Sequence, residues 1–245
     1  MESYLKDVTS WLDSHPYEVV TILIGNSDYI GVGNYTAPIQ ASGISKYAFV
    51  PPKVPMELND WPTLGELIIR NKRVVIFMDY QANQTAVDYI IDEFSNMWET
   101  PFSPTNNSFP CTVERPPNQP DNVSRDRLYI ANHNLNIPVS ITGLDLLLPN
   151  TPELNVTNNV TGYGSLGLMS DTCTARWGRP PNFLLVDYYN VGDGTVFEVA
   201  AEANGVNYTR SCCGSTSGAV SSLIKLGLRQ KIMIAVTSVL LAFLL

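Results

Sequence analysis

Residues 73–79 read RVVIFMD, an apolar run of β-branched and aromatic residues that ends at a carboxylate. The run is too short for a helix and does not alternate polar with apolar residues, so it predicts a strand buried on both faces. Further short runs predict strands at residues 18–24, 97–99, 127–131 and 183–186. Helical spacing or helix-start signals are found at residues 2–14, 61–70, 85–94 and 195–204. Strands separated by helices indicate an α/β fold with parallel strands.

The composition favours one large globular domain and argues against a nucleic-acid-binding protein. The chain has 245 residues, of which 44% are hydrophobic and 16% charged, and its formal net charge is −8. Attraction to phosphates needs clustered lysines and arginines, which this acidic chain lacks. No G-x-G-x-x-G sequence or P-loop is present, which disfavours a nucleotide-binding fold. Because the chain has 2 histidines, a histidine-built metal site is not expected, and we predict no cofactor.

The count of predicted strands suggests a TIM barrel that is not complete. A full barrel has eight strands and typically ~250 residues, whereas the runs above supply fewer strands within residues 1–209. We therefore expect an incomplete barrel that lacks its first strands, with unpaired strand edges at residues 18–24 and 183–186. The chain begins with an amphipathic helix and not with a signal peptide. We interpret this start as an N-terminal truncation or a misplaced start codon.

Glycosylation sequons and the C-terminal region predict a cell-surface protein. Residues 210–222 are a Ser/Gly-rich linker, and residues 223–245 a hydrophobic signal or anchor. Small residues, a spacer and an apolar tail are the pattern of a GPI-attachment signal, although a marginal tail anchor or a packed terminal helix is the alternative. The expected attachment sites are Gly214, Ser215, Ser217 and Gly218. The expected glycan acceptors are Asn34, Asn83, Asn106, Asn122, Asn155, Asn159 and Asn207. Four cysteines, at positions 111, 173, 212 and 213, allow three pairings if all are oxidised.

A polar residue stands at or just after the C-terminal end of each predicted strand. These residues are Asn26, Asp79, Glu99, His133 and Asp187. In a barrel the C-terminal strand ends converge on one mouth, where active sites are built. Two chemistries fit such a mouth. Paired carboxylates cleave glycosides, and a histidine base oriented by a carboxylate drives attack at phosphorus.

Several stretches together resemble one known family. They are residues 11–23 (WLDSHPYEVVTIL), 61–64 (WPTL), 73–79 (RVVIFMD), 97–102 (MWETPF), 132–135 (NHNL) and 182–190 (NFLLVDYYN). The chain is similar over residues 2–208 to the phosphatidylinositol-specific phospholipase C X-domain superfamily, in particular to the secreted or GPI-anchored PLC-like phosphodiesterases of fungi. The resemblance implies a phosphoric diester hydrolase of lipid metabolism, which acts through two histidines on the first two barrel strands. Both would precede Met1, so this chain alone is expected to be inactive.

The resemblance also implies roles for individual residues. Asp187 matches the carboxylate that orients the general-base histidine, and Asn26 stands where relatives place a substrate-contacting lysine or a metal-binding glutamate. Glu99 falls near a carboxylate that contacts the inositol ring. Asp79, together with His133 and Tyr189, completes the predicted substrate-binding set, and no metal is expected. The implied partners are a phosphoinositide or another phosphodiester, and a membrane surface reached through the C-terminal anchor; no oligomeric state is implied.

Two other functions remain open at the level of sequence. A glycoside hydrolase would use Glu99 with Asp187 or Asp79, at a carboxyl separation of about 5–5.5 Å for retention or about 6.5–9.5 Å for inversion. A non-catalytic, GPI-anchored surface glycoprotein would keep the fold without the reaction, since fold does not fix function.

Overall fold

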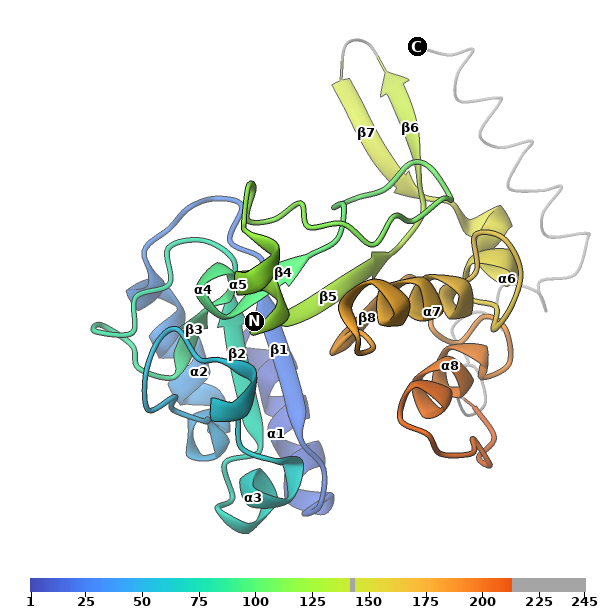
Figure 1. Cartoon of the computed structure of the whole chain (residues 1–245). Coiled ribbons are helices and arrows are strands. Elements are labelled where there is room, and N and C mark those ends of the chain that lie inside the picture. The colour runs from blue at the N-terminus through green and yellow to red at the C-terminus, as the bar shows by residue number, and fades with distance from the viewer. Residues whose placement is uncertain (142–143, 213–245) are drawn as a thin grey trace, which may run out of the picture.

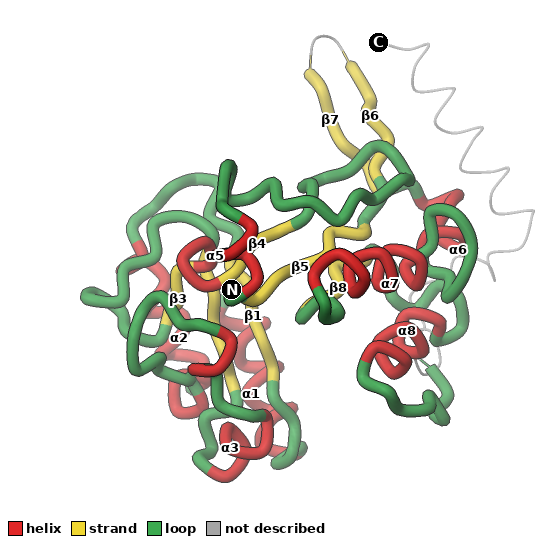
Figure 2. Tube along the Cα trace, in the orientation of Figure 1, coloured by secondary structure: helices red, strands yellow, loops and turns green. Residues whose placement is uncertain are grey.

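The computed structural model describes residues 1–141 and 144–212 and consists of parallel strands flanked by helices (Figures 1 and 2). The strands are β1 (Val20–Ile24), β2 (Val74–Met78), β3 (Ile90–Asp92), β4 (Met97–Glu99), β5 (Leu128–His133), β6 (Asn136–Ile141), β7 (Leu144–Pro149) and β8 (Phe183–Val186). The helices are α1 (Glu2–Ser14), α2 (Thr36–Ser42), α3 (Leu64–Ile69), α4 (Glu93–Asn96), α5 (Asp121–Arg125), α6 (Leu154–Thr157), α7 (Leu166–Trp177) and α8 (Thr195–Ala203), with 3-10 turns at Val32–Tyr35, Ile44–Tyr47, Leu58–Asp60 and Thr151–Glu153.

The strands form two parallel sheets, with strand orders β1-β2-β3 and β4-β5-β8, and a separate antiparallel hairpin β6-β7. Every residue of β2 is buried, as its continuous apolar run predicts. On one side of the first sheet, Leu5 and Leu12 of α1 pack against Ile24 and Ile76. Arg73 fastens this helix, since its guanidinium donates to the carbonyl oxygens of Leu12 and His15. The predicted α/β class with parallel strands is confirmed.

The opposite side of both sheets forms one continuous surface, here called the inner face. It lines a hollow of about 290 Å³ that is bounded by Thr21, Leu23, Phe77, Met97, Ile130, Phe183, Leu184 and Leu185. Strands β1, β3, β4 and β8 each have a single neighbouring strand in the two sheets, so the edges predicted at β1 and β8 are present and β3 and β4 are edges as well. Leu23 on β1 and Leu185 on β8 are each 41% exposed. Over the described residues, therefore, the sheets do not close into a barrel.

Two segments differ from their predictions. The helix predicted over residues 85–94 is wrong, because Ile90 and Ile91 pair with β2 as the strand β3 and are fully buried. Tertiary pairing overrides the local helical pattern there. The segment after residue 133, where only weak helix signals are present, contains the β6-β7 hairpin, and α7 follows it.

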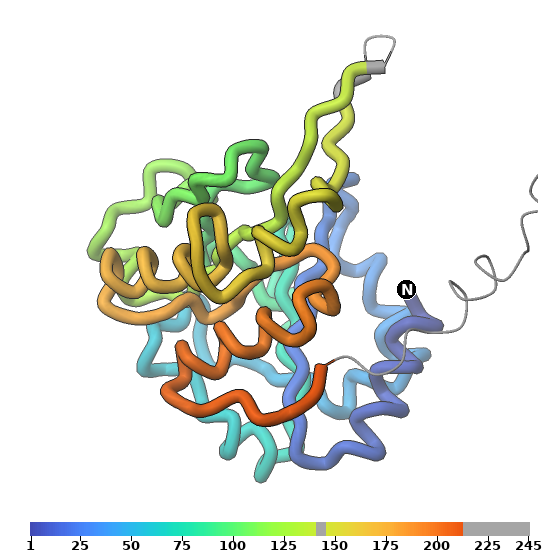
Figure 3. The backbone as a smooth tube through the Cα atoms, turned by 90° about the vertical axis from the view of Figure 1, so that its right-hand side faces the viewer, coloured from blue at the N-terminus to red at the C-terminus, as the bar shows by residue number. Residues whose placement is uncertain are grey.

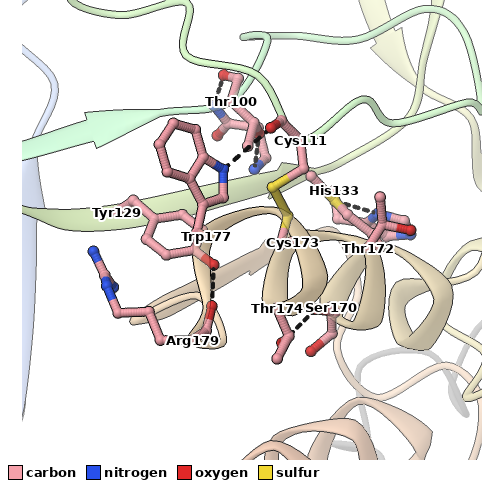
Figure 4. The surroundings of a disulfide bond; sticks show 12 residues. Thr100, Cys111, Tyr129, His133, Ser170, Thr172, Cys173, Thr174, Trp177 and Arg179 are labelled. Carbon is pink, nitrogen blue, oxygen red and sulfur yellow. Dashed lines mark hydrogen bonds between the residues drawn. A yellow bond between two sulfur atoms is a disulfide. The ribbon is translucent and has the colours of Figure 1, made fainter. Parts of the chain in front are cut away.

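A second core lies between β4, β5 and α7 and includes the Cys111–Cys173 disulfide (Figure 4). Trp98 and Tyr129 stack with a centroid separation of 4.5 Å, and Trp177 packs against Trp98 at 4.8 Å. The Trp177 indole N–H donates to the carbonyl oxygen of Cys111 at 3.2 Å. The disulfide and the indole thus hold the long loop between β4 and α5 against α7.

Candidate functional site

The alternation of side chains along a strand decides which strand ends share a face. On β4, Met97 belongs to the inner-face core and Trp98 to the second core, so Glu99 returns to the inner face. Asn132 of β5 meets it there, because its side-chain amide donates to Glu99 Oε2 at 3.0 Å. His133, one residue further, therefore points toward the helices.

The C-terminal ends of β1 and β2 are joined through Asp79. Its Oδ1 accepts the backbone N–H groups of Asn26 at 2.7 Å and Tyr80 at 2.8 Å. The Asn26 amide is 1% exposed, donates to the carbonyl oxygens of Ile30 and Tyr80, and accepts from the Tyr35 hydroxyl at 2.8 Å. With its amide so engaged, Asn26 holds the loops after β1 and β2 together.

Glu99 lies at the centre of the site and forms a buried ion pair with Arg115. Nε and Nη2 of Arg115 donate to the Glu99 carboxylate at distances from 2.7 to 3.0 Å. Nη1 of Arg115 donates to the Tyr80 hydroxyl at 3.2 Å, which connects β4 to the end of β2. The guanidinium also stacks on Phe102, 3.9 Å from the ring centroid. Arg115 stands in a long loop, and no local pattern indicates it in the sequence.

A second carboxyl group, that of Glu93 in α4, lies beside Glu99 and is fully buried. Its carboxyl faces the Glu99 carboxylate, and no other hydrogen-bond partner is present within the described chain. Burial above all, followed by the neighbouring Glu99 carboxylate, raises the pKa of Glu93 to about 9. At neutral pH, therefore, Glu93 is protonated and Glu99, paired with Arg115, carries the negative charge.

Neither histidine is placed where it could act at this site. The fully buried His133 ring has Nε2 2.9 Å from the Thr157 carbonyl oxygen and Nδ1 3.1 Å from the Met169 sulfur. Burial lowers its pKa to about 4, so the ring is neutral. His15 is exposed, stacks on Trp11 and lies just before β1, at the N-terminal ends of the strands. The ring of His133, predicted to contact substrate, is instead enclosed beside Phe109 and Met169 of the second core.

Asp187 and Tyr189 lie apart from the Glu99 network. Asp187 directly follows β8, its Oδ2 is buried without a described partner, and burial raises the pKa of its carboxyl. The Asn158 side chain donates to its carbonyl oxygen at 3.1 Å. Tyr189 is exposed and packs edge-on against Phe197. The structure thus brings Asn26, Asp79 and Glu99 together, and leaves Asp187 with an unpaired carboxyl oxygen at the next strand end.

Features predicted outside the strand ends are placed as follows. All seven sequon asparagines are exposed. Among residues 1–141 and 144–212, no three His, Cys, Asp or Glu side chains are gathered so as to hold a metal ion. In the same ranges, no helix has the length and apolar character that crossing a membrane requires. The predicted attachment sites Gly214, Ser215, Ser217 and Gly218 lie outside the described residues.

Comparison with known proteins finds one family. The family model PI-PLC X 1 matches residues 1–204. An uncharacterized secreted protein of Arthroderma benhamiae is 53% identical over 226 residues, which are 91% of this chain and 51% of that protein. The PI-PLC X domain-containing protein 1 of the same fungus is 41% identical over 196 residues, 79% of this chain and 61% of that protein. A PI-PLC X domain-containing protein of Arabidopsis thaliana is 29% identical over 210 residues, 82% of this chain and 44% of that protein.

The chain thus spans about half the length of these curated relatives. The comparison with solved structures gives no significant match.

Proposed function

Since the chain belongs to the PI-PLC X domain family, we propose that it is part of a phosphoric diester hydrolase of the phosphoinositide phospholipase C type. The observation that carries this proposal is the polar network at the C-terminal strand ends, which lies where active sites are built in parallel α/β folds. Glu99 is buried and already accepts from Arg115 and Asn132, so it would hold the partly exposed Arg115 guanidinium in place for the substrate. Asp79 and Asn26 would hold the neighbouring loops in place.

The reaction needs a general base and a general acid that these residues do not supply. His133 is buried and neutral, and His15 lies at the other end of the strands. We propose that two histidines stand on strands provided by a longer form of the protein. Asp187 would then orient the base histidine, and its unpaired, buried Oδ2 fits the role of acceptor for an imidazole N–H.

The same strands would complete a TIM barrel. The edge strands β1 and β8 present unpaired backbone groups, and the apolar inner face between them is open at Leu23 and Leu185, each 41% exposed. Apolar surface of this kind is favourable to cover. Strands inserted between β1 and β8 would pair both edges and bury both leucines.

Enzyme assays of two forms test the function. The 245-residue chain and an upstream-extended form are compared on phosphatidylinositol vesicles. We expect the extended form to release phosphorylated inositol and the shorter chain to be inactive. In the extended form, Asp187→Asn should lower kcat by about a hundredfold or more, whereas Asp193→Asn, the same charge change at an exposed position, should not. An inactive extended form would support the non-catalytic surface glycoprotein. Equal activity of the two forms would refute the proposal that the two histidines lie outside the 245-residue chain.

We also propose that the protein acts at the cell surface. The secreted name of one relative, the exposure of all seven sequon asparagines and the C-terminal small-residue and apolar pattern support this location. In a host cell, removal of residues 232–245 should release the protein into the medium. Retention of the shortened chain on the membrane would contradict GPI attachment. No observation favours the glycoside hydrolase, because Glu99 is committed to Arg115 and Asn132.

A further inference from the structure

The backbone leaves the second sheet at Asp187. The pairing of β8 with β5 ends at Val186, opposite His133, so Asp187 is the first residue beyond the ladder of paired strands. Tyr188 follows in the left-handed region at φ 48°, a conformation that is unfavourable for a bulky residue. Its carbonyl oxygen accepts the Val191 N–H at 2.8 Å, which closes a tight turn. The direction of the Asp187 side chain therefore depends on what holds this turn.

The buried side chain of Asn158 holds the turn from outside the sheet. Asn158 directly follows α6 and is 1% exposed. Its Nδ2 donates to the carbonyl oxygens of Asp187 and Tyr188, both at 3.1 Å, and of Val191 at 3.4 Å. Two views at right angles show α6 beside the chain that leads from β8 to α8 (Figures 1 and 3). One amide group thus gathers three carbonyl oxygens of the turn around it.

The segment that carries Asn158 is itself fixed at two points. His133 Nε2 lies 2.9 Å from the Thr157 carbonyl oxygen, and because a carbonyl oxygen only accepts, this ring nitrogen carries the proton. On the other side, Val160 packs against Gly167 of α7. A Cβ at Gly167 would lie 1.6 Å from the Val160 carbonyl oxygen, so only glycine permits this approach. Contacts on both sides of Asn158 therefore limit the movement of its amide.

We propose that Asn158 is a positioning residue for Asp187. By holding the backbone of the turn, its amide directs the Asp187 carboxyl toward the inner face, where the alternation along β8 places it with Phe183. The direction matters because Oδ2 of this carboxyl is buried and has no partner within the described chain. This inference rests on the proposed function, in which Asp187 orients the base histidine.

The position of the Asp187 carboxyl can be measured without catalysis, in the 245-residue chain. Burial raises the pKa of this carboxyl above its ordinary value of 3.8. Asn158→Leu keeps the shape of asparagine but removes the donor, so the turn should open and expose the carboxyl to water. We expect the pKa of Asp187 to fall toward 3.8 in this variant. Carbon-13 NMR of the carboxyl groups follows the titration, and Asp187→Asn assigns the signal.

A matched control is available in the same turn. Asn190→Leu makes the same change at an exposed position and should leave the Asp187 titration as in the parent chain. Asn158→Ser keeps one shorter donor, so it should give an intermediate pKa, and it provides the measurement if Asn158→Leu does not fold. An Asp187 pKa that is unchanged or raised in every folded Asn158 variant would overturn the proposal.

Kinetics of the extended form separate positioning from a general loss of stability. Asn158→Leu should lower kcat about tenfold and leave KM unchanged, because a displaced carboxylate orients the base histidine poorly. Added to Asp187→Asn, the same change should have no further effect, since the carboxylate that Asn158 positions is then absent. Asn190→Leu should leave both constants unchanged. Losses that add in the double variant would mean that Asn158 does not act through Asp187.

The two measurements also separate this proposal from the proposed function. If the extended parent form is inactive while Asn158→Leu lowers the pKa of Asp187, the function is wrong and the positioning of the carboxyl is supported. If the extended form is active and Asn158→Leu has the kcat of the parent, the positioning role is wrong and the function is supported.

Discussion

The buried carboxyl of Glu93 predicts a stability that falls as the pH rises. Its pKa is about 9 in the folded chain, against an ordinary value of 4.5. Between these values the unfolded chain releases the Glu93 proton and the folded chain keeps it. The free energy of unfolding therefore decreases by about 1.4 kcal/mol per pH unit in this window. The contribution is complete below pH 4.5 and is lost as the pH rises through 9.

The substitution Glu93→Gln isolates this effect, because glutamine has the shape of the protonated acid and does not titrate. From pH 5 to pH 8 the variant should gain about 4 kcal/mol of unfolding free energy relative to the parent chain. Urea unfolding followed by tryptophan fluorescence at several pH values measures the difference. Glu202→Gln removes the same charge at an exposed position and should parallel the parent chain.

A difference between Glu93→Gln and the parent chain that stays constant from pH 5 to pH 8 would refute this reasoning. Such a result would mean that Glu93 is ionised in the folded state. The argument also depends on Glu99, because Arg115 fixes the negative charge of the pair on Glu99. The effect of Glu93→Gln on the unfolding free energy can also be measured in an Arg115→Met background. If its pH dependence moved to lower pH there, the assignment of the proton to Glu93 would be wrong.

Three further predictions concern groups around the site. Replacing Cys111 and Cys173 by alanine opens a loop with a sequence separation of 62 and should lower the unfolding free energy by about 4 kcal/mol; a loss below about 1 kcal/mol would contradict this. Arg115→Met leaves the buried Glu99 carboxylate without its ion-pair partner and should lower the free energy of unfolding by about 3–5 kcal/mol. Adding Glu99→Gln should restore part of this loss in a double-mutant cycle. Burial lowers the pKa of His133 to about 4, so the contribution of His133 to stability falls as the pH drops from 6.5 toward 4 and opposes that of Glu93 in this range. The unfolding free energy of His133→Asn relative to the parent chain should therefore rise as the pH drops, in urea unfolding at pH 4–7.

The sequence predicted several strands and two of the sheet edges, because a short continuous apolar run such as residues 73–78 is typical of a parallel strand buried on both faces. It failed where partners distant in the sequence decide the structure. Ile90 and Ile91 fit a helical pattern locally and become a strand only because β2 lies beside them. Arg115 is one arginine in a Pro-rich loop, and only the folded loop brings it to Glu99. The hairpin was missed because Pro138 is an unusual strand residue, tolerated here on an edge strand.

The predicted site could have been sharper from the sequence alone. Polar residues were chosen by their closeness to a strand end, whereas the face of a strand is set by its period of two. Counting back along β5, His133 has the parity of Tyr129, which lies in the second core, and Asn132 has the parity of Ile130 on the inner face. The same count places Asp187 with Phe183, another inner-face residue. The alternation thus places His133 away from the inner face. It places Asp187, the carboxylate proposed to orient a histidine from outside this chain, on the inner face.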